Sequence, residues 1–100
     1  QKFNISIIKS DVFLYIKKIK TEFDIIFADP PYNLDDTKYL TMINEIFKKN
    51  CLKSDGYLII EHSSKKVFNK IQYFNKSKKY GDSTFSFFTK LNNWLSVYYL

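Results

Sequence analysis

Four consecutive residues of the sequence could do chemistry together: Asp29, Pro30, Pro31 and Tyr32. A residue that precedes proline is pushed out of the helical region, so Asp29 and Pro30 are both expected to be extended. Proline also lacks an N–H and cannot continue a strand ladder. We therefore predict a stiff arm on which two hydrogen-bond acceptors, the Asp29 carboxylate and the Pro30 carbonyl, can face one space beside the Tyr32 ring.

Two acceptors beside an aromatic plane suit a planar group that bears an NH2, such as the exocyclic amine of guanine or adenine. This amine is a poor nucleophile because its lone pair is spread into the ring, and acceptors on its hydrogens can localise that pair. A methylsulfonium carbon held in line could then be displaced, with positioning and electrostatics supplying most of the acceleration. Stacking on Tyr32 would hold a base that is unpaired or flipped out of its helix. The alternative is that the four residues only form a rigid turn.

The composition bounds the class of protein. One hundred residues allow one domain, and 45% hydrophobic with 19% aromatic residues is enough for a core. No apolar run reaches the length of a membrane span, and nothing at the N-terminus resembles a signal peptide. Because the chain begins with Gln1 rather than Met, we expect a piece of a longer protein. Cys51 and His62 each stand alone, which predicts a reducing cytoplasm and no metal centre.

The net charge of +6 comes from sixteen lysines without any arginine. Clustered lysine favours a polyanionic partner such as nucleic acid. The alternative is coding bias in an AT-rich genome, because charge alone is a weak guide. The lysines after the third predicted strand could contact RNA phosphates, but we interpret them as a solvated face: Lys65, Lys66, Lys76, Lys78 and Lys79.

Apolar patterning predicts alternating strands and helices. Residues 3–8 and 23–28 read as strands, the second of them apolar throughout, as expected for a strand covered on both faces. Residues 11–20 have helical spacing, and so do residues 37–50, for which Asp35 or Asp36 offers an N-cap. The apolar face of this second helix is predicted to contain Leu40, Ile43, Ile46 and Phe47, with Lys48 and Lys49 in its last turn.

The second half of the chain adds a strand and a hairpin. Ser54-Asp55-Gly56 is predicted to turn into a buried strand from Tyr57 to Glu61. Residues 72–80 and 83–90 read as an antiparallel pair around Gly81-Asp82, with the aromatic residues of these strands in hairpin and core packing. Residues 91–100 stay unassigned, outside a domain spanning residues 1–90.

The alternation predicts an α/β fold, a doubly wound and mostly parallel sheet with an antiparallel C-terminal hairpin. Such sheets bind ligands at the carboxyl ends of their strands. Three acids fall at predicted strand ends, namely Asp11, Asp29 and Glu61. Asp11 could instead only cap the helix that follows it, and Glu61 and His62 could be polar residues with local hydrogen bonds.

On these motifs the chain resembles a known family. "DPPY" after an apolar strand is typical of Rossmann-like, S-adenosylmethionine-dependent amino-methyltransferases. The blocks "FDIIFADPPY", "GYLIIEHS" and "KKYGDSTFSFF" resemble the C-terminal half of the bacterial small-subunit (16S) ribosomal RNA guanine-N2 methyltransferase family. The resemblance covers roughly residues 3–90. It implies S-adenosylmethionine as the cofactor, ribosomal RNA or the small-subunit particle as the partner, a monomeric full-length protein and no membrane.

The resemblance also implies roles for single residues. Asp29 and the Pro30 carbonyl would accept from the target amine, in a catalytic motif that includes Pro31 and Tyr32, and Tyr32 would stack on the base. Asp11 matches the acid that binds the adenine amine of the cofactor. Val12 would lie along that ring and offer its backbone N–H.

The sequence departs from the family in one respect. Its only glycines are Gly56 and Gly81, so the glycine-rich cofactor loop is absent from these residues. The family's strand order is 3-2-1-4-5-7-6, and this chain is expected to begin at strand 3. We therefore expect the first two strands to be missing, an open sheet edge at the 23–28 strand and an inactive fragment. Two alternatives stay open: a DNA adenine-N6 methyltransferase, and a non-catalytic remnant that binds nucleic acid.

Overall fold

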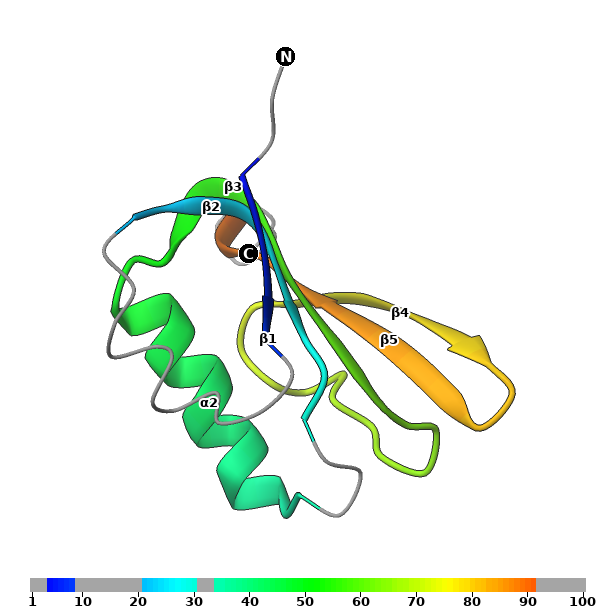
Figure 1. Cartoon of the computed structure of the whole chain (residues 1–100). Helices are drawn as coiled ribbons and strands as arrows, with labels where there is room; N and C mark the ends of the chain where they lie inside the picture. The colour runs from blue at the N-terminus through cyan, green and yellow to red at the C-terminus, as the bar shows by residue number, and fades with distance from the viewer. Residues whose placement is uncertain (1–3, 9–20, 31–33, 92–100) are drawn as a thin grey trace, which may run out of the picture.

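The computed structural model in Figure 1 describes residues 4–8, 21–30 and 34–91. Its strands form one sheet in the order β1-β2-β3-β5-β4. β1, β2 and β3 are parallel, whereas β5 and β4 run antiparallel and close the sheet as a hairpin. The described elements are β1 (Ile5–Ile8), β2 (Phe23–Ala28), α2 (Asp36–Lys48), β3 (Leu52–Ser63), β4 (Phe74–Tyr80) and β5 (Ser83–Phe88). The predicted α/β class and the C-terminal hairpin are confirmed.

The pairing of β1 corrects one prediction. The sequence predicts an open edge at the 23–28 strand, because the strands that join it to the first strand are expected to be missing. Instead β1 lies directly against β2, with Ile5 opposite Ile25. The Asn4 carbonyl accepts the Asp24 N–H at 2.9 Å where this pairing begins. The physical reason is that unpaired N–H and C=O groups of an edge strand are satisfied by whichever strand can reach them.

β3 is longer than the sequence suggested. The predicted strand covered Tyr57 to Glu61, but the observed strand includes the residues that were predicted to form a turn. The register between β2 and β3 shifts there, from Phe23 opposite Leu52 to Ile25 opposite Tyr57. A bulge of this kind accommodates extra residues in one strand without ending the sheet. Glu61 therefore lies inside β3, two residues before its end.

α2 begins as predicted and buries a slightly different face. The Asp35 side chain caps it by accepting the Lys38 N–H at 2.9 Å. Leu40 was predicted to face the core but is 41% exposed, because Tyr39 occupies that side of the first turn. Lys49 lies just beyond the last turn as the C-cap. The buried residues of the helix are Tyr39, Met42, Ile43, Ile46 and Phe47.

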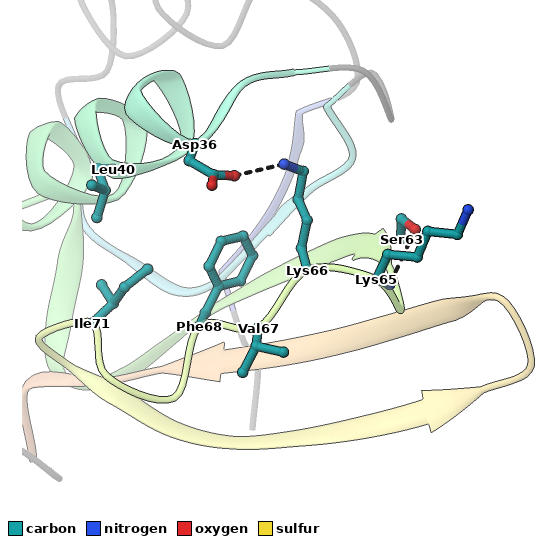
Figure 2. Close-up of a pocket in the computed structure, with 8 residues that line it drawn as sticks. All are labelled: Asp36, Leu40, Ser63, Lys65, Lys66, Val67, Phe68 and Ile71. Carbon is teal, nitrogen blue, oxygen red and sulfur yellow. Dashed lines mark hydrogen bonds and ion pairs between the residues drawn. The ribbon is translucent and has the colours of Figure 1, made fainter.

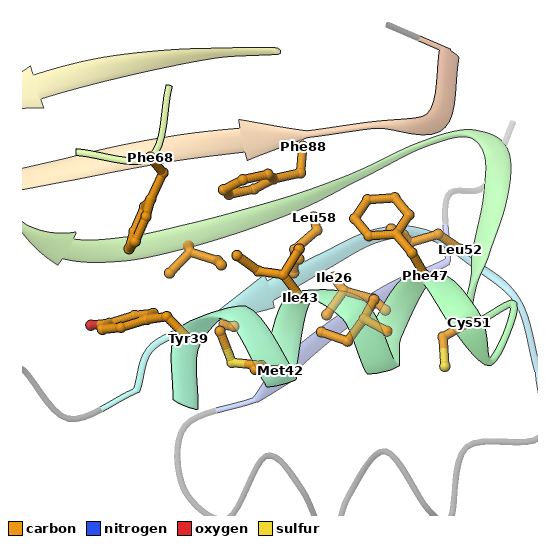
Figure 3. Packing of buried hydrophobic residues seen from close by; sticks show 13 residues of the cluster. Ile26, Tyr39, Met42, Ile43, Phe47, Cys51, Leu52, Leu58, Phe68 and Phe88 are labelled. Carbon is orange, nitrogen blue, oxygen red and sulfur yellow. The ribbon is translucent and has the colours of Figure 1, made fainter. Parts of the chain in front are cut away.

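The core lies between α2 and one face of the sheet (Figure 3). Alternate residues of β2 and β3 point into it, as a strand's two-residue period requires. From the sheet these are chiefly Ile26, Ala28, Leu58, Ile60 and Phe88, all fully buried. This packing fixes which side chains of each strand face away from α2.

The opposite face of the sheet carries the other alternate residues. Phe27, Ile59 and Phe85 are half-buried there, whereas Ile5 and Ile7 are 55% and 61% exposed. α2 lies on the far side of the sheet from this face (Figure 1). No other helix of eight or more residues occurs in the described part of the chain. The predicted helix at residues 11–20 and the tail beyond Leu91 lie outside the described residues.

Candidate functional site at the carboxyl edge of the sheet

The predicted proline arm begins where β2 ends. β2 stops at Ala28, Asp29 is half-buried and Pro30 is buried. The arm thus leaves the sheet at its carboxyl edge, as predicted from the prolines. The other predicted site residues lie outside the described part of the chain: Pro31, Tyr32, Asp11 and Val12.

The register places a second carboxylate beside the arm. Ala28 on β2 is paired with Ile60 on β3, and this is the last pair between the two strands. Asp29 follows Ala28, and Glu61 follows Ile60. The side chains of Ala28, Pro30 and Ile60 are all buried. Asp29 and Glu61 alternate with these buried positions, which puts both on the face away from α2. The sequence predicts both acids at strand ends, and in the structure both follow the last residue pair of β2 and β3.

The cross-strand pairs continue from Glu61 to an aromatic residue and then to a lysine of the hairpin. Glu61 pairs with Phe85 on β5, and Phe85 pairs with Lys78 on β4. The Phe85 ring lies 5.9 Å from the Phe27 ring and 5.8 Å from the Tyr80 ring, centroid to centroid. The sequence predicts hairpin and core packing for Phe85, and these ring contacts confirm it. Its place beside Glu61 depends on the register between β3 and β5, which the hairpin turn does not fix.

On the other face of β3, His62 is part of a buried hydrogen-bond network. Its Nδ1 lies 2.8 Å from the Ser63 carbonyl and its Nε2 lies 2.7 Å from the Ser86 hydroxyl. The carbonyl can only accept, so Nδ1 carries the proton and a neutral ring accepts from Ser86 through Nε2. His62 is 1% exposed. This matches the reading of His62 as a polar residue with local bonds.

We predict that His62 makes stability depend on pH. Burial lowers the pKa of His62 below its ordinary value of 6.5, and the charge of Lys66 adds to this effect. The unfolded chain therefore binds more protons than the folded one below pH 6.5. The contribution of neutral His62 to the unfolding free energy is complete above pH 6.5 and is lost as the pH falls through the folded-state pKa. Urea unfolding between pH 7.5 and 5.5 should show this loss. In His62→Gln the slope in that window should be clearly smaller, and equal slopes would contradict the prediction.

A groove of about 630 Å³ lies near the same edge, between the start of α2 and the loop after β3 (Figure 2). Lys66 reaches across it from the loop to Asp36, with its ammonium 2.6 Å from the carboxylate. The same ammonium lies 5.4 Å from the centre of the Tyr39 ring. Lys66 is therefore held in the protein rather than free in solvent. The lining residues are Asp36, Leu40, Ser63, Lys65, Lys66, Val67, Phe68 and Ile71.

The other lysines of this region are surface residues. Lys78 and Lys79 are exposed on β4, and Lys76 lies over the Phe87 ring with its ammonium 5.1 Å from the centroid. Between His62 and Gly81 the chain has six lysines and no acid. The hairpin side of the carboxyl edge is therefore basic.

The part of the chain that the structure describes contains neither a candidate metal site nor a membrane-spanning helix. No group of three or more His, Cys, Asp or Glu residues there could hold a metal ion. Cys51 is a buried free thiol, and burial raises its pKa. Among the same residues, no helix is long and apolar enough to cross a membrane.

The fold is a partial Rossmann-like α/β fold, similar to solved structures that are named as methylases or methyltransferases. A structure from Haemophilus influenzae named a "putative methylase" matches with a TM-score of 0.59 and 19% identity, over 80% of this chain and 51% of that chain. One from Escherichia coli named a "putative methyltransferase" matches with a TM-score of 0.55 and 16% identity, over 75% of this chain and 41% of that chain. At these identities the likeness concerns the fold.

The sequence itself belongs to the family described as "Conserved hypothetical protein 95", whose model matches residues 2–89. A "conserved hypothetical protein" from Streptococcus pyogenes has a similar structure, with 25% identity and a TM-score of 0.65. The match covers 77% of this chain and 49% of that one. The chain thus spans about half the length of the solved structures it matches. No match was found among curated proteins.

Proposed function

We propose that this chain is the catalytic part of an S-adenosylmethionine-dependent methyltransferase that acts on the exocyclic N2 amine of a guanine in small-subunit ribosomal RNA. The observation that carries the proposal is the end of β2. There a half-buried Asp29 and the proline arm leave the carboxyl edge of a partly parallel sheet. This edge is where doubly wound sheets place their ligands.

The acceptors of the arm do the main chemical work. The Asp29 carboxylate and the Pro30 carbonyl accept the two hydrogens of the target amine and draw its lone pair out of the ring. When bound, S-adenosylmethionine supplies a methyl group on a positively charged sulfur. Asp29 and Pro30 would hold the amine nitrogen in line with that carbon, so that the N–C bond would form as the C–S bond breaks and the electron pair stays on sulfur. The amine then loses its extra proton to solvent or to Asp29.

The chemistry of this edge fits a sulfonium donor. Two carboxylates, Asp29 and Glu61, follow the last residue pair of β2 and β3, and negative charge favours a cationic sulfur in a site partly shielded from water. Aromatic rings beside them can also attract a cation. Asp11 and Val12 are proposed to hold the adenine of the cofactor, and Tyr32 to stack on the target base. Ribosomal RNA or the small-subunit particle is the proposed partner of a monomeric, cytoplasmic protein.

The test is to identify the methylated product. The intact protein is incubated with labelled S-adenosylmethionine and either small-subunit ribosomal RNA, small-subunit particles or DNA, and the nucleosides are separated. We expect label in N2-methylguanosine from RNA or particles. Label in N6-methyladenine from DNA would replace this function with the adenine alternative. Transfer to none of the three, with nucleic acid still bound, would favour the non-catalytic remnant.

A further inference from the structure

Glu61 is the residue best placed to read the base beside the target amine. The pairing of β2 with β3 ends at Ala28 opposite Ile60, and Asp29 and Glu61 are the residues that follow this pair. Both alternate with buried positions, which puts them on the face away from α2. Neighbouring strands lie about 4.8 Å apart, so the two carboxylates can reach adjacent atoms of one planar base. Glu61 is half-buried, and within the described residues its carboxylate has no hydrogen bond or ion pair.

The two candidate bases differ at the atom next to the amine. In guanine the N2 amine is followed by N1–H, which is a donor. In adenine the N6 amine is followed by N1 with a lone pair, which is an acceptor. A carboxylate that faces this atom therefore forms a hydrogen bond with guanine and meets a repelling lone pair in adenine.

We propose that Glu61 selects guanine by accepting the N1–H hydrogen bond while Asp29 and Pro30 hold the N2 amine. This inference rests on the proposed function and adds a specificity-determining residue to it. The surroundings strengthen the selection. Phe85 pairs with Glu61 on the far side from β2 and packs between Phe27 and Tyr80. A half-buried carboxylate beside these rings is partly shielded from water, so a base that leaves it without the N1–H hydrogen bond is costly to bind.

The test uses 2-aminopurine, which keeps the N2 amine but has a bare N1 acceptor. Once the methylated guanine is mapped, ribosomal RNA is assembled with guanine or 2-aminopurine at that position. The wild-type protein should prefer guanine by about 10²-fold or more in kcat/KM. In Glu61→Gln the side-chain amide can donate to the bare N1. The preference should therefore fall at least tenfold, with guanine becoming a poorer substrate and 2-aminopurine a better one.

Three results keep the inference separate from the proposed function. Glu45→Gln, a matched change at a half-buried acid on α2, should leave the preference unchanged. Equal losses on both bases in Glu61→Gln, or an unchanged preference, would overturn the role of Glu61 while leaving methylation of guanine intact. A wild-type protein that does not methylate guanine at all would overturn the proposed function, and this inference with it.

Discussion

Replacement of Asp29 by alanine is expected to lower kcat/KM for methyl transfer by about 10³-fold, because a preorganised group that acts on charge developing in the transition state typically contributes this much. Asp29→Asn should be nearly as damaging. It keeps one acceptor oxygen, but it removes the negative charge and places an NH2 donor against the hydrogens of the substrate amine. The measurement is steady-state kinetics on the RNA substrate, with binding of the same RNA measured separately.

The loss should appear in kcat while the fold and RNA binding are kept. Among the described residues, no hydrogen bond or ion pair depends on the Asp29 carboxylate, so the unfolding free energy should change by only about 0.5 kcal/mol. Asp55→Asn is the matched control, since Asp55 is an exposed acid in the irregular stretch of β3, away from the arm. Activity of Asp29→Ala within tenfold of wild type would rule out the arm as the catalytic element.

The end of β2 just before Asp29 could be predicted from sequence because its physics is local. A buried strand shows as a continuous apolar run, and two prolines stop it at a fixed residue. The N-cap at Asp35 and the tight turn at Gly81 are local in the same sense, and the structure places both where the sequence indicated. These signals depend on residues only a few positions apart.

The row from Asp29 through Glu61 to Phe85 could not be predicted, because it depends on the register between strands. The bulge before Tyr57 sets the level of β3 against β2, and polar residues there looked like a turn. A shift of one residue would have put Glu61 on the α2 face and Ile60 on the other. The direct pairing of β1 with β2 escaped prediction for a similar reason. This pairing depends on which strand can reach the open edge of β2, and the sequences of β1 and β2 do not show which strand that is.

The row also explains how a common fold can carry a specific reaction here. A partly parallel sheet fixes only where ligands bind, so activity has to be argued from the side chains at that edge. Asp29 and Pro30 would act equally well on either amine. In the proposed site the face away from α2 would supply the asymmetry, because Glu61 follows the same residue pair of β2 and β3 as Asp29. If the proposed function holds, substrate choice would be a property of β3, and the methyl-transfer chemistry would be a property of the end of β2.

Of the substitutions proposed for this protein, Gly56→Ala is expected to lower the unfolding free energy most, by about 3 kcal/mol. A Cβ at this position would lie 2.9 Å from the Asp24 carbonyl oxygen and 3.1 Å from the carbonyl oxygens of Phe23 and Lys53. All three are backbone atoms, so none can rotate away as a side chain would. The methyl group would have to push β2 and β3 apart at the bulge. Asp24 would move as well, although its carboxylate accepts the Asn4 N–H at 2.9 Å and ties β1 to this end of the sheet.

Gly81→Ala is the matched control, because it adds a Cβ that meets no backbone carbonyl oxygen and so tests the effect of backbone conformation alone. Gly81 has a φ of 61°, and a Cβ there would meet nothing within 4 Å. Its cost should be only about 1 kcal/mol, from the left-handed conformation alone. Urea unfolding of both variants measures the difference. Because Gly56 lies at the opposite end of the parallel strands from Asp29, the folded fraction of Gly56→Ala should keep its kcat. A loss in Gly56→Ala no larger than in Gly81→Ala would show that β2 and β3 do not approach this closely at the bulge.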